Sequence, residues 1–229
     1  MSTKSKVAAA GAEDESKQER LEIPAPNFKI VEFELIGDAP LVIHKFSAKA
    51  REQIIATQKE GAKSQGKKKR EPKDFDAVYM GAFHVAEEGW YGIPAGAFRN
   101  GMVSACRTVG YKMTHAKLAA FVLSDGIEND DGTPLVRIIG TPERHTTYAR
   151  NDNGSVDIRV RPMWKRWSCK VRVRFDADMF TQEDVANLLM RVGQQVGVGE
   201  GRPDSKKSAG MGWGLFHLGE KQEEVKRAG

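Results

Sequence analysis

Hydrophobic and polar residues alternate in the segment NFKIVEFELIG, residues 27–37. Val31, Phe33 and Leu35 fall on one side of an extended chain, and the glutamates between them fall on the other. This period of two is typical of a strand with one buried face. The apolar stretch from Pro40 to Phe46 continues the same region as a short extended segment.

A first helix is expected after Ser47, in AKAREQIIATQKE (48–60), with Ile54 and Ile55 on its inner side. The lysine-rich residues 59–73 then interrupt the pattern. Because glycine, glutamine and like charges cannot bury apolar surface, this insertion is predicted to be a mobile loop.

Two further helices are predicted. Pro94 suits the first turn of one of them, because its missing N–H would have no partner there. Thr181 and Asp184 form a capping box at the start of the other. The core-facing residues of the two helices are predicted to be Phe98, Met102, Val103, Cys106 and Val109, and Val185, Leu188, Leu189 and Val192. DFDAVYMGAFHVA, before Pro94, fits either a helix or a strand.

The remaining segments favour strands. Lys117–Leu123 and Leu135–Ile139 flank the turn DGIENDDGTP. Val156–Arg161 and Ser168–Asp176 are predicted to pair with one another through the connection PMWKRW. LFHL (215–218) is expected to return as the last strand.

This order of elements predicts an α+β domain with an antiparallel sheet and helices on one face. Its closest named architecture is the split βαβ, ferredoxin-like arrangement of a modified RRM. Residues 27–219 form the domain, with the mobile basic loop at 59–73. Residues 1–26 are expected to be a disordered arm and 220–229 a polar tail.

Charge gathers in two parts of the chain. The formal net charge is +5, and 59–73 alone carries +5, including Lys67, Lys68, Lys69 and Arg70. Asp157–Arg174 carries +6. Its basic residues are Arg159, Arg161, Lys165, Arg166, Lys170, Arg172 and Arg174. Localised positive charge is what a phosphate-binding surface requires, although each patch taken alone also fits a solvated loop or sheet face.

Six glycines stand in VGVGEGRPDSKKSAGMGWGLF, on the pattern G-x-G-x-G repeated after eight residues. We call residues 197–214 the glycine loop. Its glycines can offer main-chain N–H groups to phosphate oxygens, and its basic side chains add charge. A slack connection is the alternative explanation. The residues concerned are Gly197, Gly199, Gly201, Gly210, Gly212 and Gly214, with Arg202, Lys206 and Lys207. Bulky replacements of Gly199 or Gly212 are expected to impair binding more than stability.

Trp164 and Trp167 flank two cations in the connection PMWKRW. Their rings can stack on splayed bases, or they can be core residues that anchor the connection. Trp213 and Phe216 are expected to be core or loop anchors.

The helix DVANLLMRVG, the loop VGVGEGRP with the distal GMGWG, and the strand LFHL resemble the C-terminal glycine-rich loop of the RAMP superfamily. That family of RNA-binding proteins includes the backbone and repeat-processing subunits of CRISPR effectors. The opening IGDAPLVIHKFS and the ending VGVGEGRP are also similar to phage and prophage proteins. The resemblance implies a modified RRM that binds RNA through the glycine loop. His44 follows the first apolar strand, where related RNA-processing nucleases can use a general base.

Several classes of protein are disfavoured. The apolar runs are far shorter than the roughly 18 residues of a membrane helix, and the N-terminal stretch lacks the apolar segment of a secretion signal. A cytoplasmic protein without a membrane partner is expected. Cys106 and Cys169 stand apart, which favours neither a disulfide framework nor a zinc site. Asn129–Asp131 is interpreted as a turn.

No histidine has a metal-ligand spacing or a recognisable carboxylate partner in the sequence, so no catalytic residue, metal or cofactor is expected. The five histidines are His44, His84, His115, His145 and His217.

We therefore expect a non-catalytic protein that binds single-stranded RNA or DNA with little sequence preference, as a homo-oligomer assembling along the strand. This expectation requires the basic residues to converge on one surface beside the glycine loop. Two alternatives stay open. One is a metal-independent ribonuclease of the CRISPR repeat-processing kind. The other is a phage structural or assembly protein whose glycine loop contacts other subunits.

Overall fold

The computed structural model describes residues 23–46, 52, 55–56, 58–59, 72–150, 154, 156–205 and 210–224. The longest described helix, α3, has 11 residues, and no helix in these ranges is long and apolar enough to cross a membrane. The helices are α2 (Phe75–Met80), α3 (Ala95–Ala105), α4 (Met113–Ala119) and α5 (Gln182–Arg191), with a 3-10 turn at Cys106–Val109 and a π-helical turn at Val192–Val196. The strands are β1 (Phe28–Gly37), β2 (Leu41–Val42), β3 (His84–Val85), β4 (Tyr91–Pro94), β5 (Ala120–Leu123), β6 (Gly126–Ile127), β7 (Pro134–Arg137), β8 (Glu143–Arg150), β9 (Val156–Trp164), β10 (Ser168–Asp176) and β11 (Phe216–Glu224).

A four-stranded antiparallel sheet with the order β11-β1-β10-β5 is the framework of the chain. Helix α3 comes between β1 and β5 in the sequence, and α5 comes between β10 and β11. The alternation predicted for β1 is confirmed, because Val31, Phe33 and Leu35 are buried. Phe33 lies opposite Val171 of β10, so both strands turn their apolar residues to the same face.

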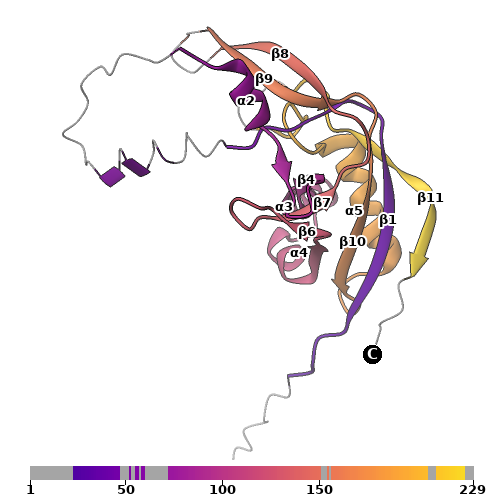
Figure 1. The fold of residues 1–229 in the computed structure, drawn as a ribbon. Helices are drawn as coiled ribbons and strands as arrows, with labels where there is room; N and C mark the ends of the chain where they lie inside the picture. The colour runs from indigo at the N-terminus through magenta and orange to yellow at the C-terminus, as the bar shows by residue number, and fades with distance from the viewer. Residues whose placement is uncertain are drawn as a thin grey trace, which may run out of the picture.

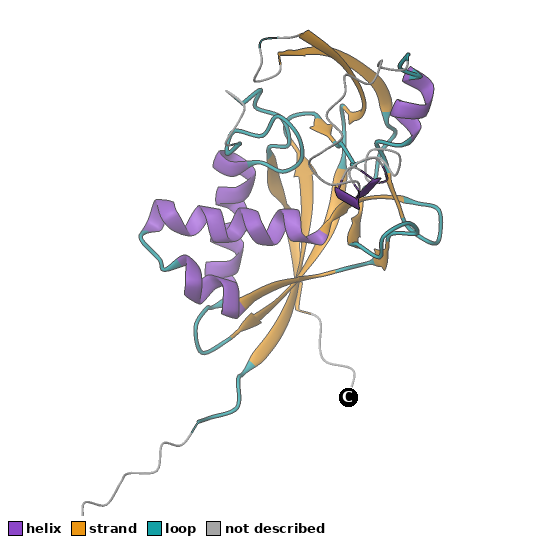
Figure 2. Ribbon diagram, turned by 90° about the vertical axis from the view of Figure 1, so that its left-hand side faces the viewer, coloured by secondary structure: helices purple, strands orange, loops and turns teal. Residues whose placement is uncertain are grey.

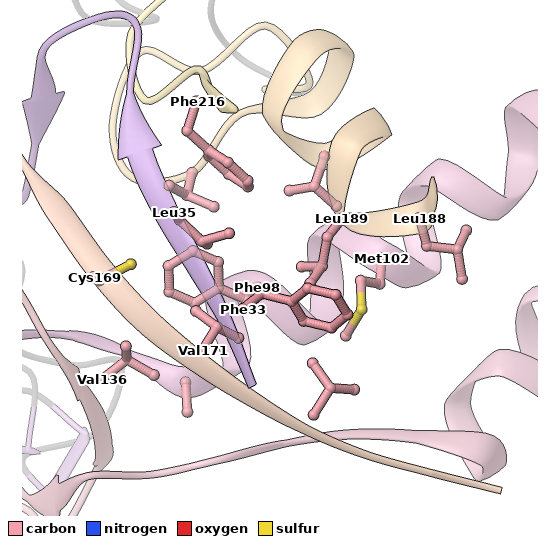
Figure 3. Close-up of a cluster of buried hydrophobic side chains, with 14 of the residues drawn as sticks. Phe33, Leu35, Phe98, Met102, Val136, Cys169, Val171, Leu188, Leu189 and Phe216 are labelled. Carbon is pink, nitrogen blue, oxygen red and sulfur yellow. The ribbon is translucent and has the colours of Figure 1, made fainter. Parts of the chain in front are cut away.

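Helices α3 and α5 cover that apolar face, and Figure 2 shows the main group of helices on one side of the sheet, with α2 apart from it. The core between the two layers is drawn in Figure 3, where Phe98 and Met102 of α3 and Leu189 of α5 meet Phe33 of β1. The chain is thus an α+β protein with antiparallel sheets.

The start of α5 is the predicted capping box. The Thr181 side chain accepts a hydrogen bond from the Asp184 main-chain N–H, and the Asp184 carboxylate accepts one from the Thr181 main-chain N–H. The hydrogen bonds from the Thr181 main chain and side chain lower the pKa of Asp184. The predicted core residues Val185, Leu188 and Leu189 are all buried.

A second antiparallel sheet, β2-β9-β8, contains a long hairpin that lies at one end of the molecule together with α2 (Figure 1). The predicted pairing of Val156–Arg161 with Ser168–Asp176 is wrong. Strand β9 pairs with β8 and β2, whereas β10 pairs with β1 and β5. The connection between β9 and β10 passes from one sheet to the other instead of closing a hairpin.

A third antiparallel sheet has the order β3-β4-β7-β6. Its strands hold two to four residues each. The sheet packs its Ile93 and Val136 into the common core. It matters for the site because β3 and the turn between β6 and β7 stand beside the end of β2.

Some predicted boundaries are corrected. Lys117–Ala119 belongs to α4, whose Ala116 and Ala119 are buried while Leu118 is exposed, so the strand begins at Ala120. Ile55, expected on the inner side of a helix, is 50% exposed, and Val109 is 48% exposed. Strand β8 was not predicted, and β11 continues to Glu224, beyond residue 219.

Truncating Phe98 tests the core between α3 and the sheet. The ring is fully buried and lies 6.2 Å, centroid to centroid, from the ring of Phe216. We expect Phe98→Ala to lower the free energy of unfolding by about 3–5 kcal/mol, measured by urea denaturation. Val109→Ala, at the exposed end of the same stripe, should change it by less than about 0.5 kcal/mol. Equal losses in the two variants would contradict this account of the core.

Candidate functional site

The φ angle along the glycine loop alternates between positive values at the glycines and negative values at the residues between them that the structure describes. All six of its glycines have φ between +67° and +75°, and no other residue type in the described chain has a positive φ. A side chain in this left-handed region costs about 1–2 kcal/mol, so the pattern G-x-G-x-G is what the local backbone requires.

Close packing against β2 adds a second requirement for glycine. The Glu200 N–H donates to the Val42 carbonyl at 2.9 Å, and the Gly214 N–H donates to the Pro40 carbonyl at 2.8 Å. A Cβ atom on Gly199 would stand 2.5 Å from the Val42 oxygen, and one on Gly214 would overlap the Val198 carbonyl. A bulky residue at Gly199 would therefore disturb the folded loop directly, a cost in stability that the expected effect on binding did not take into account.

An open cavity of about 940 Å³ lies between the glycine loop, α3 and the chain after β2. The loop contributes its main chain at Gly197 and Gly199. Helix α3 contributes the small residues Ala97, Gly101 and Ser104. Because these side chains are short, the helix surface itself forms part of the wall.

The wall of the cavity also carries paired charges. Arg107, after α3, donates to both carboxylate oxygens of Asp204 at 2.8 Å, and the Ser104 hydroxyl donates to the same carboxylate. The hydrogen bond from Ser104, followed by that from Arg107, lowers the pKa of Asp204. Arg202 donates to the Gly199 carbonyl at 3.0 Å. The bonds from Ser104 and Arg107 to Asp204 hold the loop against the helix, whereas the bond from Arg202 is internal to the loop.

His44 lines the same cavity. Although the residue is exposed, partial desolvation is the largest influence on its pKa and lowers it. Glu200 acts in the opposite direction, and Arg161 and Arg159 lower the pKa further. A histidine in this setting is largely neutral at pH 7. The structure thus places His44 beside the glycine loop.

Arg161 is buried between the β8–β9 hairpin and the glycine loop. Its guanidinium donates to Glu200 at 3.2 Å and to the Thr147 hydroxyl at 2.8 Å. Burial lowers its pKa from the ordinary value. Arg161 is therefore a structural link to the loop, and it is buried instead of lying on the basic surface expected for residues 157–174.

A buried ionic cluster stands behind the cavity. The Lys45 ammonium contacts the Glu128 carboxylate and lies 2.9 Å from an oxygen of Asp130. Nδ1 of His84 lies 2.5 Å from the other oxygen of Glu128. Burial alone would lower the pKa of Lys45, but the hydrogen bonds to Glu128 and Asp130 outweigh it and raise that pKa.

The expectation that no histidine has a carboxylate partner is consequently wrong. His84 pairs with Glu128, and His217 pairs with Asp38 at 2.5 Å. Glu128 follows His84 by 44 residues, a distance at which spacing carries no signal. The turn after Glu128 was interpreted correctly, because the Asp131 carboxylate accepts the N–H of Thr133. Within the described ranges, no three histidine, cysteine or acidic residues gather closely enough to hold a metal ion.

The basic residues of β10 lie on the other side of the sheet. Because Cys169, Val171 and Val173 face the helices, Lys170, Arg172 and Arg174 face away from them and from the cavity. The expected convergence of these cations with the glycine loop is therefore wrong.

Acidic groups neutralise part of the positive charge on this outer face. Lys170 lies 3.4 Å from Glu32, and Arg172 lies 3.1 Å from Asp125. The guanidinium of Arg174 stands over the rings of Phe28 and Phe121, at 4.8 and 5.0 Å from their centroids. The basic stripe of the sequence is thus not a free cationic surface.

Trp164 and Trp167 are core residues, not stacking platforms. They are 1% and 4% exposed, and the Trp167 indole N–H donates to the Ala39 carbonyl at 2.9 Å. Phe216 is buried as expected, and Trp213 packs edge-on against His145. Lys165 and Arg166 are exposed, and Lys165 lies 2.6 Å from Glu143.

The remaining predicted contact residues lie either in or near the cavity and its loop, or outside the described residues. Arg159 lies close enough to His44 and Arg161 to influence their pKa values, and Arg202 lines the cavity. Gly210 and Gly212 belong to the returning part of the loop. Outside the described residues lie Lys67, Lys68, Lys69, Arg70, Lys206 and Lys207.

No known protein family matches this chain, and no curated protein sequence does either.

Replacing two glycines separates packing from backbone handedness. A Cβ on Gly214 would overlap main chain, whereas one on Gly212 would meet open space, and both have a φ of +70°. We expect Gly212→Ala to cost about 1–2 kcal/mol of unfolding free energy and Gly214→Ala clearly more, measured by urea denaturation. Similar costs would show that the loop does not pack tightly on itself.

Proposed function

We propose that the chain is a ferredoxin-like, modified RRM domain that binds single-stranded nucleic acid in the cavity beside the glycine loop. The fold assignment is supported by the strand order β11-β1-β10-β5. Numbered by position along the chain, these strands are fourth, first, third and second, and the helices that cover the sheet, α3 and α5, follow the first and the third, as in the split βαβ arrangement.

The observation that carries the binding proposal is that glycine-loop main chain forms a wall of an open cavity with cations beside it. In the described part of the chain, the N–H of Gly199, which lines the cavity, donates to no protein acceptor, in contrast to those of Gly197, Val198 and Glu200, and the N–H of Gly201, next to the lining, is also unused. Unused N–H groups beside arginines are suited to phosphate oxygens.

Two cations can take part: Arg202 lines the cavity, and Arg159 lies outside its lining but close enough to His44 to influence its pKa. Among the described residues, neither Arg159 nor Arg202 has a carboxylate partner, whereas Arg107 and Arg161 are paired with Asp204 and Glu200. Contacts made through main-chain N–H and guanidinium groups favour the backbone of a strand over its bases. Little sequence preference is therefore expected. The cavity lies at the upper end of the roughly 300–1,000 Å³ found for ligand sites, so it can admit a nucleotide unit.

The proposal keeps the binder non-catalytic and homo-oligomeric along the strand. It assigns binding to the side of the sheet that carries the helices, away from the basic residues of β10. RNA and DNA both fit, since the proposed contacts are made to phosphate.

Neutralising matched pairs of cations tests the location. We expect Arg159→Gln with Arg202→Gln to weaken binding of single-stranded homopolymers about tenfold at 0.1 M salt, and to reduce the salt slope by about 0.7 for each phosphate that is no longer neutralised. Fluorescence anisotropy over a range of salt concentrations measures both quantities, for oligo-dT and oligo-U alike.

The control is Lys170→Gln with Arg174→Gln, which removes the same charge from the opposite face and should leave binding unchanged. The proposed site would be contradicted if the control variant bound more weakly while the Arg159 and Arg202 variant bound as tightly as the unaltered chain. Oligomers that form without any affinity for either strand would favour the assembly-protein alternative. Cleavage of oligo-U that disappears in His44→Ala would favour the ribonuclease.

A further inference from the structure

Part of the cavity wall is apolar and has no role in binding phosphate. The glycine loop contributes main chain and Arg202, but another part of the lining carries no charge. We call this part the apolar wall. Its partly exposed members are Pro94, Ala97 and Met113, and its buried members are Ile43, Ile93, Val196 and Val198. An apolar surface in a concave site gains nothing from a phosphate group, but it is stabilised when an apolar surface of a ligand covers it.

Helix α3 leaves space in front of this wall. Ala97, Gly101 and Ser104 follow one another at helical spacing and therefore lie on one side of the helix. A Cβ atom on Gly101 would stand 2.7 Å from Val192, so packing within the core accounts for that glycine. Ala97 is partly exposed to the cavity, and its single methyl group leaves room that a longer side chain would occupy.

Asn100 adds a polar group next to the apolar wall. It lies on α3 three residues after Ala97, is exposed and lines the cavity, and its amide makes no hydrogen bond to another described residue. In contrast, Ser104 and Arg107 are engaged by Asp204. A carboxamide both donates and accepts hydrogen bonds, so it suits the polar edge of a base.

Contacts to phosphate alone do not account for a preference for single strands. A duplex presents the same backbone groups to main-chain N–H and guanidinium donors. A base can enter a cavity only when it is neither paired nor stacked within a duplex. Selection of a single strand therefore requires a part of the site that takes a base.

We propose that the cavity holds one unpaired base of the strand against the apolar wall, with Asn100 at the edge of the base, while a phosphate of the same strand lies against the glycine loop. This inference rests on the binding function proposed above, and it adds the part of the ligand that selects a single strand. The wall meets the face of the base, which all bases share, so the sequence preference stays small. The carboxylates of Asp204 and Glu200 are paired with Arg107 and Arg161, which reduces their repulsion of a phosphate.

Three ligands of equal length test the base on the unaltered chain: oligo-dT, an abasic oligomer with the same sugar-phosphate backbone, and the duplex of oligo-dT with oligo-dA. Fluorescence anisotropy at 0.1 M salt measures each affinity. We expect the abasic oligomer to bind about tenfold more weakly than oligo-dT, because no base covers the apolar wall. The duplex should also bind at least about tenfold more weakly. The salt slopes of oligo-dT and the abasic oligomer should agree, since their phosphate contacts are the same.

The outcomes separate this inference from the binding function. Equal affinities for oligo-dT and the abasic oligomer would overturn the base site and leave phosphate binding intact. A duplex that binds as tightly as oligo-dT would overturn it as well. Absence of binding to all three ligands would refute the binding function itself.

A matched pair of variants on α3 locates the base. Ala97→Leu fills the space in front of the apolar wall without changing the charge. We expect it to weaken binding of oligo-dT about tenfold and to leave the affinity for the abasic oligomer unchanged. Gly96→Leu places the same side chain on the neighbouring residue, which is exposed, lies outside the cavity lining and has open space around its Cβ position. It should bind both oligomers as the unaltered chain does.

Equal weakening of both oligomers in Ala97→Leu, or an effect of Gly96→Leu as large as that of Ala97→Leu, would overturn the assignment of the base to this wall. A thermal unfolding curve for each variant shows whether it is folded. If Ala97→Leu is unfolded, the comparison of oligo-dT with the abasic oligomer on the unaltered chain still decides.

Discussion

The contact between the glycine loop and the six residues 40–45 is the constraint on which the rest of the site depends. The carbonyls of Pro40 and Val42 receive N–H groups from Gly214 and Glu200, with no side chain between the two main chains. The same short segment sends His44 to the cavity and Lys45 to the buried cluster. A change in this contact would therefore displace the loop, the cavity wall and the charge behind it together.

The buried cluster extends that constraint to the third sheet. Lys45 donates its main-chain N–H to the carbonyl of Ala82, two residues before β3, and its ammonium reaches Glu128 in the turn between β6 and β7. Burying a charge costs several kcal/mol when it has no partner. Consequently the end of β2, β3 and this turn are held in one arrangement, and His84 is oriented within it.

Local patterns predicted much of the framework. The alternation in β1 and β10 and the capping box of α5 depend on neighbours within a few residues, so they were readable and are confirmed. The strands that pair with β9 could not be predicted, because the sequence of a strand does not show which distant strand it pairs with. Trp164 and Trp167 sit beside cations in the sequence, yet the passage of the chain between two sheets buries both rings.

The site itself was predicted only in part. The glycine loop was identified from composition, but its glycines are required by positive φ angles and by close contacts with the Val42 and Val198 carbonyls, which exist only in the folded chain. His84 and Glu128 meet through three separate strand pairings, beyond the reach of spacing rules. Counting basic residues also overestimated the free charge, because it could not show which carboxylates lie opposite them.

The outer face of the four-stranded sheet affects how strongly this protein attracts other charged molecules. Lysine and arginine on β10 stand across from glutamates on β1, in the register Glu34 to Lys170 and Glu32 to Arg172. Their fields largely cancel within a few ångströms of the surface, as in a zwitterionic layer. The overall positive charge therefore does not show where a polyanion would approach the protein, since the outer face of this sheet offers it no net attraction.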